Sequence, residues 1–348
     1  MFSSPNNRPE NETSFIANSY LFARDVLNRP VNWIVAVVVI VLIFSAFAGY
    51  WAASMSLHPE RRPLSAELIA EADRVFQHDR AERTAFDVRA HDGILLRGWL
   101  VQPVANSGAD SSVSESKSRD WALLFHGVAD NRVGDLGVAD FLLRAGYGVV
   151  MMDSRAHGES EGDLATYGWK EREDVRAIVA ALEDKVHPQC IFAFGVSMGG
   201  GIALQAAAVE PRISAVTAEA PFTSFREASY DYAGFHRSPW LGRILFRTVV
   251  EAGFLATKKM AGFYPSDISP EKSVAQRPFP ILLISDGDDV VLPLRHQQAI
   301  FAAAKGPKEL WVVPRAIHAS AMGVTPEEYE RRVLSFFAKA HDACLTAR

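Results

Sequence analysis

Cysteine is scarce in this chain, with only Cys190 and Cys344 among 348 residues. Two cysteines provide neither the disulfide framework of a small secreted domain nor a zinc ligand set. Cys190 falls in an apolar run typical of a buried strand, and Cys344 lies near the C-terminus. We therefore expect two free thiols, and we predict no metal and no cofactor.

Concentrated charge of either sign is also missing. The net charge of −5 arises from interspersed acidic and basic residues, and no basic block is dense enough to follow a phosphate backbone. This distribution argues against nucleic acid as a partner. With 49% hydrophobic residues, the chain can bury one large core, and a single catalytic domain of about 250 residues fits its length. The oligomeric state is left open.

The sequence does contain one long uncharged run. No charged residue occurs within 30–57, and residues 33–51 are nearly all apolar. About 19 helical residues extend roughly 28 Å, which matches the hydrocarbon core of a bilayer. Trp33 at one end, and Tyr50 and Trp51 at the other, lie where aromatic rings favour the membrane interface. We predict a single-pass anchor over 33–51.

The anchor has two alternatives. A buried core helix would show a polar face, which this run lacks, and a signal peptide would have a shorter apolar stretch near the N-terminus. The A-x-A pattern at 46–48 keeps cleavage open. The anchor would follow an N-terminal tail, 1–32, and precede a juxtamembrane segment, 52–81. Two arginines on each side of the span leave its orientation undecided.

A soluble domain is predicted over 82–348. It begins with apolar runs at 85–91 and 94–101 around an Asp-Gly turn, which indicates a β-hairpin. Residues 105–120 are small and polar without an apolar period, so we expect a loop outside the core.

Apolar runs then alternate with helical patterns, which is typical of βαβ units and a mostly parallel sheet covered on both faces. The expected strands are 122–125, 148–152, 190–195, 215–219, 281–285 and 310–313, and the expected helices are 136–144, 171–183, 198–209, 294–304 and 327–341. Such a sheet places its active site at the carboxyl ends of its strands.

Residues 222–276 interrupt this alternation with aromatic residues and mixed charge. One interpretation is a helical cap over the site, and ordinary packing of amphipathic helices is the alternative for any single aromatic residue. The candidates for the lining of the cap are Phe225, Tyr230, Tyr232, Phe235, Trp240 and Phe246.

Residues 195–199 match the pattern G-x-S-x-G. The pattern is weak without context, but here it follows an apolar strand, 191–194, and opens a helical stretch, 200–209. A strand-to-helix elbow needs glycine on both sides of a serine because the turn leaves no room for Cβ atoms. We predict Ser197 as a nucleophile exposed beside a helix N-terminus.

A serine nucleophile needs a base that a carboxylate orients, and in elbows of this kind the acid and then the base follow the serine. His318 lies in a loop after the last strand, where the other downstream histidine, His341, falls inside the final helix. We predict His318 as the base. Asp286, Asp288 and Asp289 all follow the expected strand 281–285 and could all face the imidazole. We favour Asp289, which lies four residues before Pro293, and keep Asp288 as the next candidate acid because counting does not exclude a one-residue slip in a loop.

Two backbone donors are required for the oxyanion of a tetrahedral intermediate. The N–H of Met198 at the helix start is one, and the N–H of Val128, in the loop after the strand that ends at Phe125, is the other. His126 precedes the serine in the chain and is interpreted as an orienting residue.

Together these motifs resemble the α/β-hydrolase superfamily over about 82–342. More narrowly, the chain is similar to membrane-anchored α/β-hydrolase-domain proteins and to bacterial serine aminopeptidase- and lysophospholipase-like hydrolases. The resemblance rests on His126-Gly127, the block 153–160 (DSRAHGES), the elbow 195–199, the block 267–270 (DISP), Asp289-x-x-x-Pro293 and His318. It implies that Asp153 and His157 are structural, and the sequence departs from it at Ser285-Asp286, where relatives often carry His-Gly.

The main functional hypothesis is hydrolysis of a carboxylic ester, thioester or lipid ester through an acyl-enzyme on Ser197. An amidase or peptidase with the same triad is the enzymatic alternative, because a nucleophile does not specify its leaving group. A catalytically silent binding module on a membrane stalk is the alternative from another class. The expected partners are a small-molecule or lipid ester and the membrane.

Overall fold

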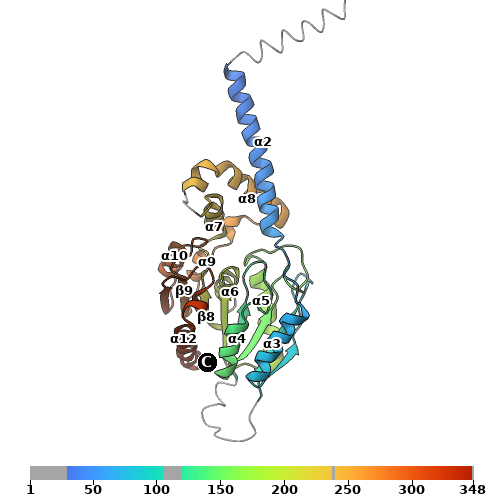
Figure 1. Ribbon diagram of the computed structural model, residues 1–348, viewed down its shortest axis with the longest axis vertical. Coiled ribbons are helices and arrows are strands. Elements are labelled where there is room, and N and C mark those ends of the chain that lie inside the picture. The colour runs from blue at the N-terminus through green and yellow to red at the C-terminus, as the bar shows by residue number, and fades with distance from the viewer. Residues whose placement is uncertain (1–29, 105–118, 237–239, 347–348) are drawn as a thin grey trace, which may run out of the picture.

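The computed structural model describes residues 30–104, 119–236 and 240–346 (Figure 1). Most of the predicted N-terminal tail, 1–32, and most of the predicted loop, 105–120, lie outside the described residues.

A central sheet organises the domain. Within the described residues it has eight strands in the order β1-β4-β6-β5-β7-β8-β9-β10. The strands are β1 (Ala81–Ala85), β4 (Gly98–Pro103), β5 (Trp121–Phe125), β6 (Gly148–Met152), β7 (Ile191–Val196), β8 (Ile213–Glu219), β9 (Ile281–Asp286) and β10 (Lys308–Val313). The pairs β1–β4 and β4–β6 are antiparallel, and all pairs from β6 to β10 are parallel. The predicted, mostly parallel α/β fold is confirmed.

The predicted hairpin has two parts. β1 pairs with β4, while β2 (Val88–Arg89) and β3 (Leu95–Leu96) form a separate short ladder beyond it. The Asp-Gly turn closes this ladder, where the N–H of Gly93 donates to the carbonyl of Ala90. Gly93 has φ +90°, which explains glycine at this position.

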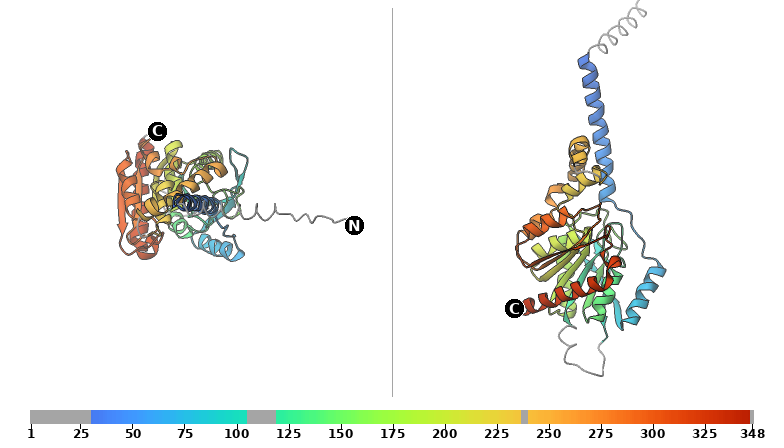
Figure 2. Two further views of the ribbon diagram at one scale, coloured as in Figure 1. Left: turned by 90° about the horizontal axis from the view of Figure 1, so that it is seen from above. Right: turned by 60° about the vertical axis from the view of Figure 1, so that its left-hand side comes forward.

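Helices cover both faces of the sheet because its central strands are apolar on both sides (Figure 2). α5 (Glu171–Val186), α6 (Met198–Val209) and α10 (Arg295–Ala303) contribute to one core, and α3 (Ala66–His78), α4 (Leu136–Arg144) and α12 (Pro326–Thr346) contribute to the other. The short helix α11 (Ala321–Val324) precedes α12. From β5 onward, the strands and helices predicted outside 222–276 have the expected bounds to within about two residues, except that α5 is three residues longer and α12 five residues longer at their C-termini.

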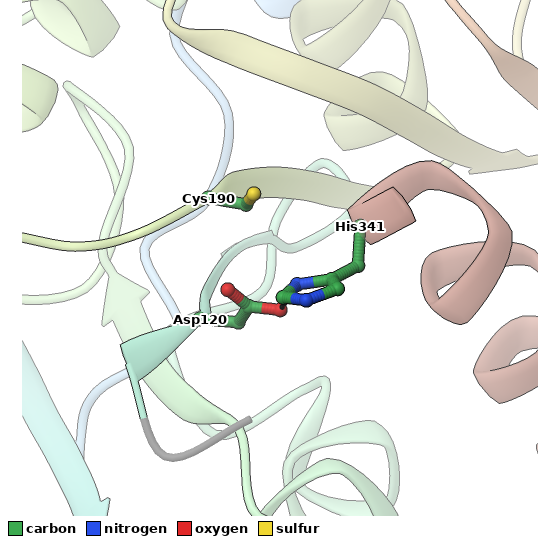
Figure 3. A group of neighbouring side chains, drawn as sticks. All are labelled: Asp120, Cys190 and His341. Atoms are coloured by element: carbon green, nitrogen blue, oxygen red, sulfur yellow. Dashed lines mark hydrogen bonds and ion pairs between the residues drawn. The ribbon is translucent and has the colours of Figure 1, made fainter. Parts of the chain in front are cut away.

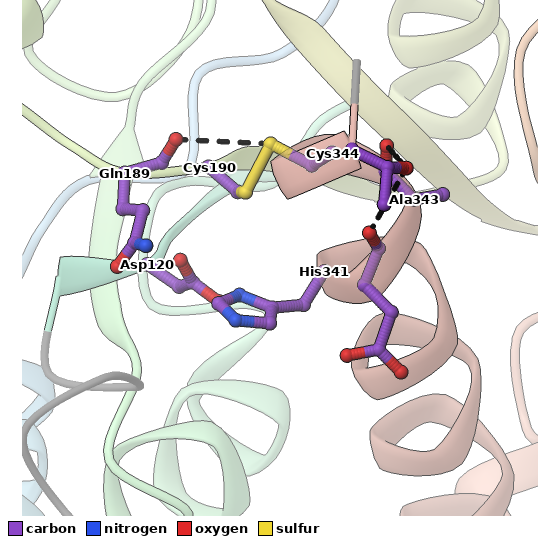
Figure 4. The surroundings of a disulfide bond; sticks show 8 residues. Asp120, Gln189, Cys190, His341, Ala343 and Cys344 are labelled. Atoms are coloured by element: carbon purple, nitrogen blue, oxygen red, sulfur yellow. Dashed lines mark hydrogen bonds and ion pairs between the residues drawn. A yellow bond between two sulfur atoms is a disulfide. The ribbon is translucent and has the colours of Figure 1, made fainter. Parts of the chain in front are cut away.

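The two cysteines form a disulfide, so the expectation of free thiols is wrong. Cys190, directly before β7, is bonded to Cys344 in the last turns of α12, with a Cα–Cα distance of 6.3 Å (Figure 4). The residues are 154 positions apart, and only the path of α12 across the sheet brings them together. No local sequence signal reports such a contact.

The apolar N-terminal run forms one helix, α2 (Pro30–Leu57), longer at both ends than the predicted span of 33–51. The helix is long and apolar enough to cross a membrane. A core helix or a signal sequence can have the same length and hydropathy. Most of its apolar side chains are exposed. Every fourth residue near its C-terminal end is buried, namely Ser45, Gly49, Ala53 and Leu57.

That buried stripe of α2 packs along α8 (Arg247–Ala261), beside which it runs in Figure 1. The Ser45 hydroxyl donates to Thr248 Oγ1 at 2.8 Å. A Cβ atom on Gly49 would lie 2.5 Å from the carbonyl oxygen of Val249, so only glycine permits this approach. The N–H of Ala165 donates to the carbonyl of Leu57 at 2.9 Å. The end of α2 is thus part of the folded domain.

Helices also occupy the predicted insert, 222–276. They are α7 (Phe225–Ala233), the π-helical turn η2 (Leu241–Leu245), α8, the 3-10 turn η3 (Pro265–Asp267) and α9 (Pro270–Val274). The segment follows β8 and precedes β9, so it starts and ends at neighbouring strands. In Figure 1, α7 and α8 lie at the end of the domain from which α2 emerges.

Candidate active site

Ser197 occupies a sharp turn between β7 and α6. Its backbone has φ 54°, a left-handed conformation that is costly for serine and typical of a functional turn. A Cβ atom on Gly199 would lie 1.8 Å from the carbonyl oxygen of Phe125, and one on Gly195 would lie 2.3 Å from Gly199. The two flanking glycines of the motif are therefore required by close packing of the backbone.

The structure brings three predicted site residues into one hydrogen-bonded chain. The Ser197 hydroxyl lies 2.9 Å from Nε2 of His318, and Nδ1 of His318 lies 2.7 Å from Oδ2 of Asp289. His318 comes from the loop after β10 and Asp289 from the loop after β9. With Nδ1–H donating to the carboxylate, Nε2 is left to accept the serine proton.

Asp289 is held as a carboxylate. Its side chain is buried, and its Oδ1 accepts the backbone N–H groups of Val291 at 2.7 Å and Leu292 at 2.9 Å. Burial opposes ionisation, but the hydrogen bonds from His318 and from these N–H groups outweigh it and lower the pKa of Asp289. The other candidate acid, Asp288, is exposed, and its N–H donates to the carbonyl of Ala316.

The two predicted oxyanion donors line the same cavity as the serine. Val128, Ser197 and Met198 all contribute to its wall. In the part of the chain that the structure describes, neither the Val128 nor the Met198 N–H is used in a turn or loop hydrogen bond. Both are therefore available to a ligand. Met198 opens α6, where the helix dipole adds a partial positive charge.

The family model of the alpha/beta hydrolase fold matches residues 121–273. An esterase of Pyrococcus furiosus, Pf2001, superposes with a TM-score of 0.61 over 81% of this chain and 99% of its own, at 23% identity. The chain is an α/β-hydrolase-fold protein. The uncharacterised Bacillus subtilis protein YqkD is 25% identical over 270 residues, 76% of this chain and 82% of the relative. The zebrafish (Danio rerio) lysophosphatidylserine lipase ABHD12 is 23% identical over 302 residues, 82% of this chain and 74% of the relative.

In this α/β-hydrolase-fold protein, His126 is part of the scaffold of the Val128 loop. Its Nε2 accepts the N–H of Ser154 at 3.0 Å, and its Nδ1 donates to the carbonyl of Gly127 at 2.7 Å. Burial lowers the pKa of His126, which keeps the ring neutral in these two roles. It has no hydrogen bond with Ser197 among the described contacts.

The block 153–160 braces the same loop. Asp153 accepts the N–H of Arg132 at 2.7 Å, the Arg132 guanidinium at 2.6 Å and the N–H of Glu159 at 2.8 Å. Burial lowers the pKa of His157 to about 4. Neither Asp153 nor His157 contacts the Ser197–His318–Asp289 chain within the described residues, which agrees with a structural role.

Two further carboxylates lie beneath the site: Glu219, which the sequence did not single out, and Asp286, one of the three aspartates expected near the base. Glu219, the last residue of β8, accepts the N–H of Ala321 at 3.1 Å and the hydroxyl of Tyr329 at 2.6 Å. Asp286 accepts the N–H of Ala319, next to His318, at 2.8 Å. Burial is the main cause that raises the pKa of both. A charged residue that ends a buried strand was the available signal for each.

A cavity of about 450 Å³ opens above Ser197. Of the six aromatic residues considered, only Phe225 and Tyr232 line it. Three residues of α2 that were not expected there, Ala52, Ala53 and Ser56, also do. Other walls come from α7 and α8, so that the cavity lies between the sheet domain, the helical insert 222–276 and the N-terminal helix.

Groups of side chains of the kind that bind metals occur at two buried places. Asp286, Asp289 and His318 form one, but both ring nitrogens of His318 are already hydrogen bonded. Asp120, Cys190 and His341 form the other (Figure 3). There the sulfur belongs to the disulfide, and His341 Nδ1 lies 2.6 Å from Asp120. Neither group offers a free ligand set in the geometry that the structure describes.

Proposed function

We propose that the protein is a serine hydrolase that cleaves carboxylic esters, including lipid esters or thioesters, through an acyl-enzyme on Ser197. The observation that carries the proposal is the hydrogen-bonded chain Ser197–His318–Asp289, whose serine lines a mainly apolar cavity. Serine needs such a chain to become nucleophilic, because its hydroxyl is almost entirely protonated at neutral pH.

In the proposed reaction, Ser197 Oγ attacks the ester carbonyl carbon while its proton moves to His318 Nε2. The Asp289 carboxylate stabilises the imidazolium that forms, and the Val128 and Met198 N–H groups stabilise the oxyanion. Collapse of the intermediate breaks the carbon–oxygen bond, and His318 returns the proton to the leaving alkoxide. Water then repeats both steps and releases the acid.

An ester is favoured over an amide by the surroundings of the serine. The cavity walls are mainly apolar, which suits the acyl part of a lipid better than a peptide backbone with its unpaired polar groups. The relatives named above as a lipase and an esterase support the same direction. Amidase or peptidase activity remains the alternative with the same triad.

Labelling with a fluorophosphonate tests the proposal. The purified full chain in detergent should label, and Ser197→Ala and His318→Ala should not, whereas Ser266→Ala on the cap turn η3 should label like the wild type. Hydrolysis of p-nitrophenyl butyrate and of the matching anilide compares ester and amide. Labelling that persists in Ser197→Ala would exclude the proposed nucleophile, and silence of all four proteins would favour a binding module.

For location, we propose that α2 stays attached as a membrane anchor and that the catalytic domain lies in an oxidising compartment. Retention is supported by the packing of Ser45, Gly49 and Leu57 against the folded domain, which cleavage near 46–48 would disrupt. The Cys190–Cys344 disulfide supports the compartment, because disulfides persist where thiols are not kept reduced.

Two measurements test the location. Mass spectrometry of the membrane-extracted protein should find residues 30–57 still present. A maleimide–polyethylene glycol reagent should shift the protein on a gel only after reduction, and the Cys344→Ser variant, with its single free thiol, should shift without reduction. Loss of the residues before 49 would contradict retention of the anchor. Modification of the unreduced wild type would contradict the disulfide and with it the oxidising compartment.

A further inference from the structure

We infer that the cavity above Ser197 is an acyl-chain-binding site of which the anchor helix α2 is one wall. It takes one long acyl chain of an ester lipid from the leaflet that α2 enters, an inference that rests on the proposed ester hydrolysis. A tether would only hold an enzyme near its substrate. Here the anchor shapes the binding site.

The wall formed by α2 is built from small side chains. Ala52, Ala53 and Ser56 line the cavity on one side, and Val250 and Gly253 of α8 line it on another. Gly49 sits against Gly253, where the backbones of the two helices approach each other. Small residues at such a crossing allow helices to pack closely in a membrane. The small side chains of α2 and α8 leave space for an unbranched acyl chain between these helices and Ser197.

The junction below this wall is held in place. Leu57 is fully buried and packs in one hydrophobic cluster with Phe222 and Leu292. Phe222 and Leu292 also line the cavity. The Tyr167 hydroxyl donates to the carbonyl of Ser56 at 2.8 Å. One guanidinium nitrogen of Arg61 donates to the carbonyl of Ser160 at 2.5 Å. The anchor cannot swivel away from the site without breaking these contacts.

The position of the cap along α2 indicates the source of the chain. Ser45, bonded to Thr248 of α8, lies six residues before Trp51 at the end of the predicted span. Six helical residues extend about 9 Å, so the start of α8 lies at that depth inside the hydrocarbon. The side chains just before it, Ile244 and Leu245, are 73% and 65% exposed. Arg247, which opens α8 beside them, is also exposed. Exposed apolar side chains next to a cation are expected for a cap that enters the leaflet where hydrocarbon meets the headgroups.

The volume and lining define the ligand. About 450 Å³ is near the lower end of the range for small-molecule pockets. The walls are mainly apolar, and the hydroxyl groups of three lining residues already donate to backbone carbonyls, namely Tyr167, Ser229 and Thr257. The other lining hydroxyls belong to Ser56, Ser197 and Tyr232. One acyl chain with its ester carbonyl at Ser197 matches this arrangement.

The acyl-length profile tests the wall. In detergent, kcat/KM is measured for p-nitrophenyl esters whose acyl chains have four and twelve carbons. The proteins compared are the wild type, Ala53→Phe on α2 and Ala233→Phe on α7. Ala46→Phe, on the exposed part of α2, is the matched control. Each buried methylene contributes about fourfold to binding. Excluding four of them should lower the ratio of twelve- to four-carbon activity at least about 100-fold in Ala53→Phe and Ala233→Phe. Ala46→Phe should keep the wild-type ratio.

The outcomes separate the inference from the proposed function. If Ala233→Phe shifts the ratio and Ala53→Phe does not, α2 is not a wall and the inference fails while ester hydrolysis stands. If Ala53→Phe loses both esters equally at an unchanged melting temperature, chain length is not what this wall selects, and the inference fails too. Absence of Ser197-dependent hydrolysis of the four-carbon ester in wild type would refute the proposed function itself.

A second arm tests the source of the chain. The protein is reconstituted in phosphatidylcholine vesicles that contain monooleoylglycerol. Ile244→Asp at the cap tip should lower hydrolysis of this lipid at least about tenfold, because a carboxylate resists the hydrocarbon. The same variant should keep four-carbon ester activity within about twofold. The control Val104→Asp, exposed at the end of β4, should change neither. Equal lipid hydrolysis by Ile244→Asp would show that the chain arrives from water.

Discussion

The two sides of the candidate active site, here called its floor and its roof, are held together by different kinds of contact. The floor consists of Ser197, His318 and Asp289, which lie in the segments directly after β7, β10 and β9 at the carboxyl ends of these strands. Each side chain is held by directional hydrogen bonds. The roof consists of α2, α7 and α8. The helix α2 meets α8 through small side chains and the Ser45–Thr248 hydrogen bond, whereas α7 and α8 are also joined by the Glu251 carboxylate, which accepts hydrogen bonds from Arg226 and Tyr230. The floor depends on the identity of single atoms, whereas the crossing of α2 and α8 in the roof depends on shape.

This difference predicts how each region responds to substitution. Removing one polar atom from the floor should abolish chemistry with little effect on folding, because the loops keep their backbone contacts. A change in the roof should leave the chemistry intact and alter which chains fit or how firmly the helices pack. The two regions can therefore be separated by measuring turnover of a short ester alongside stability.

The sharpest test of the floor is Ser197→Ala. With the nucleophile gone, kcat for a short ester should fall about 10⁶-fold, while the melting temperature stays close to that of the wild type. Stopped assays with product detection provide the measurement. A variant that retains more than about a hundredth of wild-type turnover would place the nucleophile elsewhere.

A smaller loss is expected from the orienting acid. Asp289→Asn keeps the size of the side chain but favours the wrong tautomer of His318, so kcat should fall about 10⁴-fold. Asp288→Asn is the matched control, since Asp288 is exposed one residue away. It should retain wild-type kcat. The reverse order of effects would assign the acid to Asp288.

The floor was predictable because its chemistry is written locally. The elbow at 195–199 needs two glycines at fixed spacing, and His318 lies after the last strand by chain order. Counting alone left Asp288 and Asp289 both open. The structure separates them because the turn after β9 buries one side chain and exposes the other, which depends on backbone direction in a loop.

The roof and the disulfide were not predictable in the same way. The sequence indicated an apolar helix over 33–51, but nothing in its composition says that Ala53 faces a cavity. Ser45, Gly49, Ala53 and Leu57 form a stripe only in contact with α8, more than 190 residues later in the chain. Likewise, Cys190 and Cys344 meet across 154 positions. Contacts of this range depend on the completed fold.

At the end of the sheet opposite the site, the disulfide should matter for stability alone. In the chain-entropy model, a bridge that closes a loop of 154 residues stabilises by up to about 5 kcal/mol. The double variant Cys190→Ala/Cys344→Ser should therefore melt several degrees lower, with kcat for the short ester unchanged when assayed well below the transition. Loss of kcat at that temperature would couple this end of the sheet to the floor.

The helix crossing in the roof should show an intermediate cost. Gly49→Ala introduces a Cβ atom 2.5 Å from the carbonyl oxygen of Val249, and the forced shift of α8 should lower the free energy of unfolding by about 1–3 kcal/mol. Gly323→Ala is the control, because its Cβ atom meets nothing within 4 Å. Differential scanning fluorimetry in detergent compares the two. Equal melting temperatures would mean that α2 is not packed against α8.

The smallest effect concerns the buried carboxylate beneath the floor. Burial first, and then the nearby Asp286, raises the pKa of Glu219 to about 8 from 4.5. Between these values the folded protein keeps a proton that the unfolded chain has released, so stability should fall as pH rises through this window, by at most about 1.4 kcal/mol per pH unit. Below pH 4.5 both the folded and the unfolded state hold the proton, so stability no longer changes with pH through this group.

Glu219→Gln removes the titration, and its side-chain amide can still form hydrogen bonds with Tyr329 and Ala321. The melting temperature of wild type should therefore decline relative to that of the variant between pH 5 and about 8. Parallel pH profiles would mean that Glu219 is ionised in the folded protein. An ionised Glu219 would place a buried charge beneath the floor, and the floor would then differ from the roof in its hydration as well as in its hydrogen bonds.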